Sequence, residues 1–279
     1  MGGRPDVLLI MPDQMRGDCL SGLGHGGVRT PVLDGLAARG TLFRRAYSTV
    51  TSCIPARYGL LSGLSPQRSG VVGFAAKPFD TSTLPAVLGE AGYATVLVGR
   101  YMHQPTESGA CGYQCEVLGS THVDDDAYDR HLKRNAPAGG PGCDGIRQLV
   151  ASLGLTNNGW AAAPWPLEEA LHPTAWAVAE SRRVVAEAEG DRPLFLTTSF
   201  YAPHPPLFPP GRFYEACAGR PLPRPAMGDW VDVDALSTEG DAQGHRVRLT
   251  GEALARAQAG YFGLIDQIDA AIEALVDDF

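Results

Sequence analysis

Five residues within positions 53–63 form the most chemically specific stretch of the sequence. Cys53 is followed by Pro55 and Arg57, and the stretch closes with Ser62 and Gly63. A thiol beside the start of a helix lies where backbone N–H groups and the helix dipole favour negative charge. Most lone cysteines are buried apolar residues, so the neighbouring arginine is the feature that favours chemistry. The stretch predicts a nucleophile at residue 53 beside an anion-binding guanidinium.

Three further groups of polar residues follow continuous apolar runs. Such runs are typical of strands buried on both faces of a sheet, and here they span 6–11, 93–98 and 193–200. They lead directly to Asp13 and Gln14, to Arg100 and His103, and to His204. Parallel sheets place their ligands at the carboxyl ends of the strands. These residues are therefore expected to lie at one edge of the sheet with residue 53.

This set of side chains suits hydrolysis of a sulfate or phosphate ester. The oxygens of Asp13 and Gln14 are ligands for a hard divalent cation, which polarises ester oxygens. Arginine offers a bidentate fork to an anion. A histidine can exchange a proton with the leaving group near neutral pH.

The elements that position these residues alternate between helix and strand. Helical patterns are expected at 30–40, 83–92, 173–189 and 250–278, with Thr30 as the N-cap of the first. This alternation predicts an α/β fold with a central, mostly parallel sheet flanked by helices on both faces. Residues 104–172 read as an irregular insertion or lid. On the last helix, Asp266 and Asp269 are expected on a solvated face.

Composition narrows the function further. The 279 residues carry a formal net charge of −8 and a sequence pI near 5.3, which argues against nucleic acid or an anionic membrane as the main partner. The first residues lack a signal peptide pattern, and no stretch approaches the roughly 20 apolar residues of a membrane span. A cytoplasmic location is expected. The six cysteines show neither a compact disulfide framework nor a zinc pattern.

The residues at 53–63 resemble the signature of the formylglycine-dependent type I sulfatases, within the alkaline phosphatase superfamily. The likeness extends along nearly the whole chain, from the strand that ends at Asp13 to the Ala-Pro-His-Pro-Pro segment around His204. It implies that a formylglycine-generating enzyme oxidises Cys53 to formylglycine. It also implies a divalent metal, calcium, and a small-molecule sulfate ester as substrate.

The resemblance assigns roles to individual residues. Asp13, Gln14 and residue 53 would bind the metal, and Arg57 would hold the formylglycine hydrate. His103 would act as acid or base on the covalent sulfate intermediate, and Arg100 would stand in for the family's lysine. His204 would contact the sulfate or the leaving oxygen.

Three departures leave alternatives open. Gln14 stands where many members have aspartate, so a phosphonate monoester or phosphodiester is an alternative substrate. The loop at 99–103 matches the family's Gly-Lys-x-His only loosely. The family's later strand, with an Asp-His or Asp-Asn pair, and its C-terminal subdomain have no counterpart in residues 1–279. The chain is therefore expected to be an N-terminal catalytic portion, weakly active alone, or a non-catalytic sulfatase-like domain. The core left exposed makes association with a second copy a further alternative.

Overall fold

A four-stranded parallel sheet forms the centre of the molecule. The computed structural model describes residues 4–74, 77–102, 111–188, 190–232, 234–236 and 247–279. The strands run in the order β1 (Val7–Asp13), β4 (Leu194–Pro203), β2 (Ala94–Gly99) and β3 (Cys115–Leu118). All three pairings are parallel. The predicted α/β class and parallel sheet are confirmed.

Strand β4 lies between β1 and β2, and all ten of its residues are buried. Its apolar run contacts neighbours on both sides and on both faces, which explains why it shows no alternation of polar and apolar residues. The register pairs Asp13 of β1 with Pro203 and Gly99 of β2 with Ser199. The carboxyl ends of these strands therefore meet at one edge of the sheet, as the sequence predicts.

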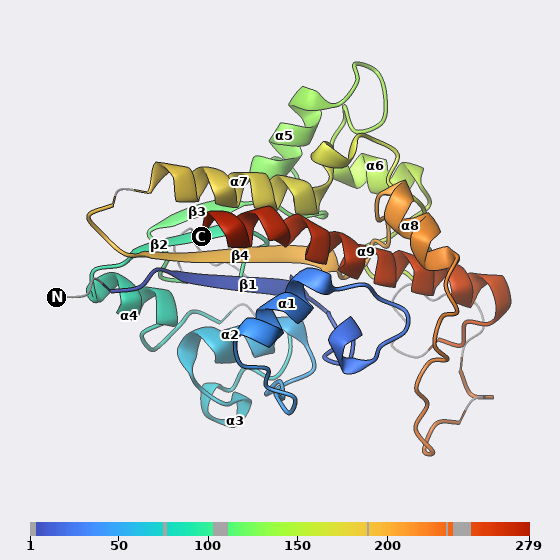
Figure 1. Ribbon diagram of the computed structural model, residues 1–279, viewed down its shortest axis with the longest axis horizontal. Coiled ribbons are helices and arrows are strands. Elements are labelled where there is room, and N and C mark those ends of the chain that lie inside the picture. The colour runs from blue at the N-terminus through green and yellow to red at the C-terminus, as the bar shows by residue number, and fades with distance from the viewer. Residues whose placement is uncertain (1–3, 75–76, 103–110, 189, 233, 237–246) are drawn as a thin grey trace.

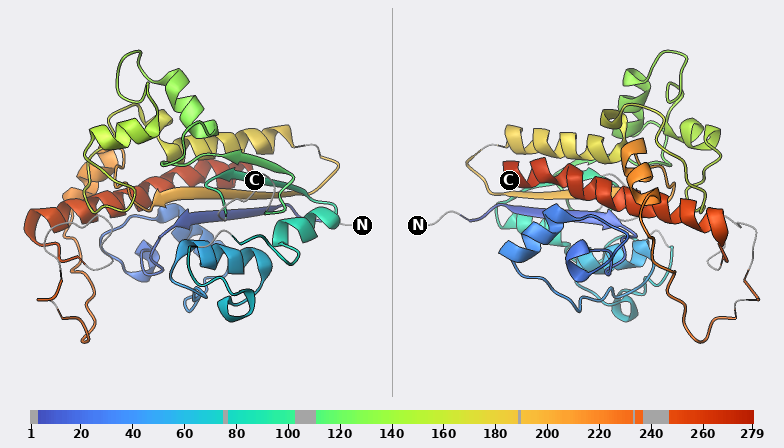
Figure 2. Two further views of the ribbon diagram at one scale, coloured as in Figure 1. Left: turned by 180° about the vertical axis from the view of Figure 1, so that it is seen from behind. Right: turned by 45° about the vertical axis from the view of Figure 1, so that its right-hand side comes forward.

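Helices cover both faces of the sheet (Figures 1 and 2). One face is covered by α7 (Pro173–Glu187) and α9 (Gly251–Asp278). The other is covered by α2 (Cys53–Ser62) and α4 (Leu84–Glu90), whereas α1 (Pro31–Arg39) packs against α9. Among the described residues, no helix is both long and apolar enough to cross a bilayer.

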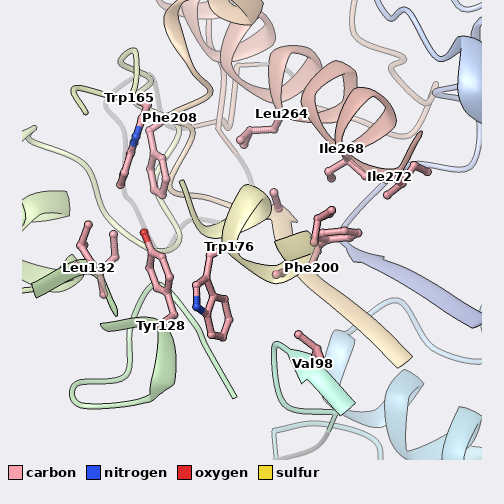
Figure 3. Packing of buried hydrophobic residues seen from close by; sticks show 14 of the residues in the cluster. Val98, Tyr128, Leu132, Trp165, Trp176, Phe200, Phe208, Leu264, Ile268 and Ile272 are labelled. Carbon is pink, nitrogen blue, oxygen red and sulfur yellow. The ribbon is translucent and has the colours of Figure 1, made fainter. Parts of the chain in front are cut away.

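The largest apolar cluster lies between the sheet and the helices α7 and α9 (Figure 3). Ile268 and Ile272 of α9 and Trp176 of α7 pack there beside Phe200 of β4. The cluster continues outward through Tyr128, whose ring lies 5.4 Å from that of Trp176. Burial of several large side chains of this kind, at about 1.5–3 kcal/mol each, fixes the two helices on the sheet.

The segment expected to be irregular contains regular structure. Within 104–172 the chain forms strand β3, helices α5 (Ala127–Asn135) and α6 (Ile146–Ser152), and the 3-10 turn η2 (Glu169–Leu171). The other short elements are η1 (Ser21–Leu23), α3 (Pro66–Ser69) and α8 (Gly211–Ala218). Figure 1 shows α5 and α6 standing above one end of the sheet, beyond α7.

The expectation of a solvated acidic face on α9 is wrong. Asp266 and Asp269 are 4% and 1% exposed. Asp269 accepts the N–H groups of Leu33 at 2.8 Å and Val32 at 3.1 Å, and Asp266 accepts that of Arg29 at 2.6 Å. The helix α1 therefore has its first N–H groups capped from α9. Thr30, the expected N-cap, makes no such bond.

Candidate active site

Cys53 is the first residue of α2 and is half-buried. Pro55 falls in the first turn, where a helix has no use for its missing N–H. The closing residues of the motif end the helix. Ser62 Oγ donates to Tyr58 O at 2.7 Å, and Gly63, with φ of 68°, donates its N–H to Gly59 O at 2.9 Å. The motif therefore places Cys53 at the N-terminus of α2 and places the residues that end the helix at its C-terminus.

Asp13 ends β1 and is 4% exposed. Its carbonyl oxygen accepts the N–H of His204 at 3.1 Å, which ties the ends of β1 and β4 together. Gln14 follows with φ of 64°, a left-handed conformation that costs about 1–2 kcal/mol in residues other than glycine. The Tyr261 hydroxyl of α9 donates to Gln14 O at 2.8 Å and holds this turn.

Two buried arginines face the Asp13 carboxylate. Arg100 Nε lies 2.9 Å and Arg57 Nη2 lies 3.9 Å from Asp13 Oδ2, and both side chains are about as buried as that of Asp13. The Arg57 contact is too long for a hydrogen bond, the Arg100 contact is not aligned as one, and Oδ2 has no hydrogen-bond partner among the described residues. Arg100 Nη2 also lies 3.5 Å from Cys53 Sγ. The structure thus brings Asp13, Cys53, Arg57 and Arg100 into one cluster.

The cluster is electropositive. Burial, and then the charge of Arg100, lower the pKa of Arg57 to about 10, so its guanidinium stays protonated at neutral pH. Arg57 is anchored by Nη1, which donates to Ser199 Oγ at 3.1 Å and contacts Met102 Sδ at 3.2 Å. Two guanidinium groups against one carboxylate leave a net positive charge beside residue 53. Such a charge in a water-poor site attracts an anionic group.

His204 lies on the wall of the same cavity. Burial lowers its pKa below the ordinary value, so the ring is neutral near pH 7. Its Nδ1 lies 2.7 Å from the carbonyl oxygen of Pro205. Because a carbonyl can only accept, Nδ1 carries the proton, and the lone pair of the neutral ring is on Nε2. His204 is therefore poised as a proton acceptor rather than a donor.

The cavity above these residues has a volume of about 1180 Å³. Asp13, Gln14, Cys53, Arg57 and His204 line its polar part. Its outer part is built from aromatic and small polar side chains, which include Tyr47, Phe74, Asn158 and Trp160. Trp160 comes from the segment 104–172, so that segment contributes to the cavity wall.

The described residues supply one side of a hard-cation site. Asp13 is the single carboxylate among the described residues that line the cavity, and no cluster of three or more His, Cys, Asp or Glu in the described part of the chain could hold a metal. The orphaned, buried Oδ2 of Asp13 and the amide of Gln14 are oxygen donors of the right chemistry. Calcium takes six to eight oxygens, so these residues fit the cation as a partial ligand set.

One further residue was predicted to belong to the site, and three residues near Arg100 were not predicted. His103 lies outside the described residues. Tyr101 and Tyr201 place their rings beside the Arg100 guanidinium, with ring centroids 5.2 and 5.6 Å from Cζ. His122 lies 3.0 Å from the Tyr101 hydroxyl. His122 follows β3, so the strand-end argument would have found it had this four-residue strand been recognised.

Comparison with known proteins decides the family. The sulfatase family model matches residues 5–279. The chain belongs to the sulfatase family. It is 35% identical to an arylsulfatase of Clostridium perfringens and 25% identical to a choline-sulfatase of Rhizobium meliloti. These alignments cover 96% and 99% of this chain but only 58% and 54% of those proteins. This sulfatase-family chain therefore spans a little over half the length of the curated relatives it matches.

Solved structures agree on the fold. The phosphonate monoester hydrolase of Agrobacterium radiobacter superposes with a TM-score of 0.76 at 24% identity, over 99% of this chain and 59% of that one. A second phosphonate monoester hydrolase, from Silicibacter pomeroyi, gives 0.69 at 21% identity. At these identities the likeness concerns the fold alone. The sulfatase-family chain thus has the fold of a little over half of each of these proteins.

Proposed function

We propose that this chain carries the nucleophile and an anion-binding part of a sulfuric-ester hydrolase whose nucleophile is formylglycine derived from Cys53. The observation that carries the proposal is the position of Cys53. Cys53 starts a helix, and its Sγ lies 3.5 Å from Nη2 of the buried Arg100 guanidinium. Arg100 and Arg57 both face the Asp13 carboxylate. The sulfatase family and the arylsulfatase relative support the ester class.

The residues of the chain would act on a bound sulfate ester as follows. Arg57 and Arg100 bind the sulfate oxygens through charge-assisted N–H groups, and their burial keeps competing water away. Neutral His204 presents Nε2, which accepts a proton during the reaction. Asp13 sets the orientation of both guanidinium groups. These contributions exist before any modification or metal is added.

Two groups complete the proposed chemistry. Formylglycine at residue 53 supplies a hydrated aldehyde oxygen as the nucleophile. A divalent cation, calcium, held in part by Asp13, Gln14 and residue 53, supplies polarisation of the ester oxygens. The remaining oxygen ligands would come from outside the described residues.

A phosphonate monoester or phosphodiester hydrolase is the second candidate. Gln14 is the residue that leaves it open, because a neutral amide lines the cavity where the sulfatase resemblance expects a second carboxylate. Sulfate monoesters, phosphonate monoesters and phosphodiesters are all monoanions. The arrangement of two guanidinium groups against one carboxylate suits each of them.

Conversion of residue 53 is the first test. The chain is co-expressed with a formylglycine-generating enzyme, and the peptide that carries residue 53 is analysed by mass spectrometry. We expect the mass loss that follows when the CH2SH side chain becomes CHO. Turnover of an aryl sulfate and of an aryl phosphonate monoester is then measured with and without calcium. Cys53→Ala should abolish turnover, whereas Cys115→Ala, on the exposed edge strand, should not.

Each outcome has a separate meaning. An unconverted peptide would reject formylglycine as the nucleophile, and turnover that survives Cys53→Ala would reject residue 53. Faster hydrolysis of the phosphonate would select the second candidate. Conversion without turnover of either ester would favour a non-catalytic sulfatase-like domain.

A further inference from the structure

The guanidinium of Arg100 is held on several sides. The side chain is 4% exposed, and its Cζ lies over the rings of Tyr101 and Tyr201, 5.2 and 5.6 Å from the ring centroids. Nη2 lies 3.5 Å from Cys53 Sγ. Nη1 is fully buried without a hydrogen-bond partner among the described residues. A buried donor of this kind costs about 1–3 kcal/mol unless something accepts its bond, so the site has a spare donor beside residue 53.

The loop that follows β3 anchors both tyrosines. The Tyr101 hydroxyl lies 3.0 Å from His122 Nε2. The His122 ring also packs on Tyr201, with centroids 5.2 Å apart. Burial lowers the pKa of His122 to about 4, so at neutral pH it meets the tyrosines as an uncharged ring. One short loop thus contacts both aromatic walls around Arg100.

The loop itself is firmly attached. Gly119 N–H donates to Gly99 O at 2.9 Å, and Ser120 N–H donates to Asp126 Oδ2 at 2.7 Å. Asp126 also caps α5 through the N–H of Asp129. The loop is therefore fixed to strand β2 on one side and to a helix on the other, which makes it a rigid support.

We propose that His122 is a positioning residue that, through the rings of Tyr101 and Tyr201, holds Arg100 so that its N–H groups face the anionic group bound at residue 53. The identity of that group as a sulfate ester rests on the proposed function. The arrangement also accounts for arginine at this position. A planar guanidinium stacks on aromatic faces while its edge remains free for an anion, which a lysine ammonium cannot do.

The test measures how strongly the surroundings of residue 53 attract an anion, and it does not require turnover. The full chain is expressed without the maturation enzyme, so that Cys53 remains a thiol. Rate constants for its alkylation by anionic iodoacetate and by neutral iodoacetamide are measured by peptide mass spectrometry. Their ratio cancels the ionisation of the thiol and most of its accessibility. We expect the ratio at Cys53 to exceed that at exposed Cys115 by about tenfold, because two close cations attract the anionic reagent.

The variants separate positioning from packing. Arg100→Leu should remove most of the preference for iodoacetate. Tyr101→Phe keeps the ring but loses the contact with His122, and it should lower the ratio about threefold, in the range of couplings between contacting residues. His122→Ala should act in the same direction. His122→Gln places an amide where Nε2 lies and should restore the ratio. His131→Ala, on α5, is the matched control and should leave it unchanged.

Two results would overturn the proposal. If Arg100→Leu removes the preference while His122→Ala and Tyr101→Phe retain it, His122 does not position Arg100. If Arg100→Leu itself has no effect, its guanidinium does not face residue 53. Thermal unfolding checks each variant, and Tyr101→Phe decides the matter should His122→Ala fail to fold. Absence of conversion or of turnover would reject the proposed function and leave these ratios unaffected.

Discussion

Two buried aspartates in this molecule are used in opposite ways. Asp269 on α9 is 1% exposed, and each of its oxygens accepts a backbone N–H from the start of α1, at 2.8 and 3.1 Å. Asp13 at the end of β1 is 4% exposed, and its Oδ2 lies near two guanidinium groups without a hydrogen-bond partner among the described residues. Two aspartates that are similarly buried therefore differ in how many of their carboxylate oxygens have hydrogen-bond partners.

The difference teaches how to separate structural from functional carboxylates. A buried acceptor that is fully bonded contributes to folding and has little left to offer a ligand. A buried ion pair whose hydrogen-bonding groups are not all paired is weak evidence for stability. Its guanidinium groups can still bind an anion, and its carboxylate can still bind a cation. Asp269 therefore joins two helices, whereas Asp13 organises a site. The first two of the following predictions test this contrast, and the third tests a buried histidine that also caps a helix.

Asp269→Ala should give the largest effect on stability. It leaves two N–H groups of α1 without their acceptors, and each such group costs about 1–3 kcal/mol. We expect the free energy of unfolding to fall by about 3 kcal/mol in urea denaturation, a sum of two penalties of that size. Glu273→Ala, an exposed position one turn further along α9, should stay within about 0.5 kcal/mol of the unchanged chain. Equal losses in both variants would show that the cap contributes nothing.

Asp13→Asn should show a smaller loss that sulfate reverses. The substitution keeps the shape but leaves Arg57 and Arg100 without their carboxylate. A bound sulfate would then replace the missing charge, and a ligand that binds only the folded state raises its stability. We expect sulfate to raise the melting temperature more in Asp13→Asn than in the unchanged chain. In Asp269→Asn it should have no extra effect. The same response in both variants would contradict the contrast between the two aspartates.

His172→Asn should give the smallest effect at neutral pH and should relieve a loss of stability at acid pH. His172 caps α7 by accepting the Thr174 N–H at 3.1 Å, and burial lowers its pKa to about 3. Below pH 6.5 the unfolded chain binds a proton that the folded chain does not, so this histidine destabilises the fold as the pH decreases. The slope approaches about 1.4 kcal/mol per pH unit. Asparagine keeps an acceptor but does not titrate.

The stability of His172→Asn relative to the unchanged chain should therefore rise as the pH falls from 6.5 towards 4. Thermal unfolding across this range measures the difference. A constant gap between them would mean that His172 is protonated in the folded state, contrary to its burial.

Much of the site could be predicted because its residues end long apolar strands. The runs that became β1, β2 and β4 are continuous, and the polar residues after them meet at one sheet edge. Strand β3 escaped prediction because Cys115-Glu116-Val117-Leu118 is short and mixes polar with apolar residues at the edge of the sheet. His122 was missed with it.

The two misread features depend on contacts that no local pattern contains. Helical periodicity places Ile265, Ile268 and Ile272 of α9 inward and suggests that Asp269 faces solvent. In the structure a second partner, α1, covers the adjacent arc of the helix, so the buried face is wider than the apolar stripe. Thr30 was expected to cap α1, but the N–H of Val32 is bonded instead by Asp269, which lies 237 positions further along the chain.

That long-range cap has a consequence for the order of folding during synthesis. The chain emerges at about 5–20 residues per second, so α1 leaves the ribosome well before the aspartate that caps it. The turn at Gln14 also depends on α9, because the Tyr261 hydroxyl of α9 donates to the Gln14 carbonyl oxygen. Contacts between such distant segments form late. The strand that bears Asp13 and the helix α1 therefore acquire their final arrangement only when α9 has docked, so the site assembles after the segments that form it have been synthesised.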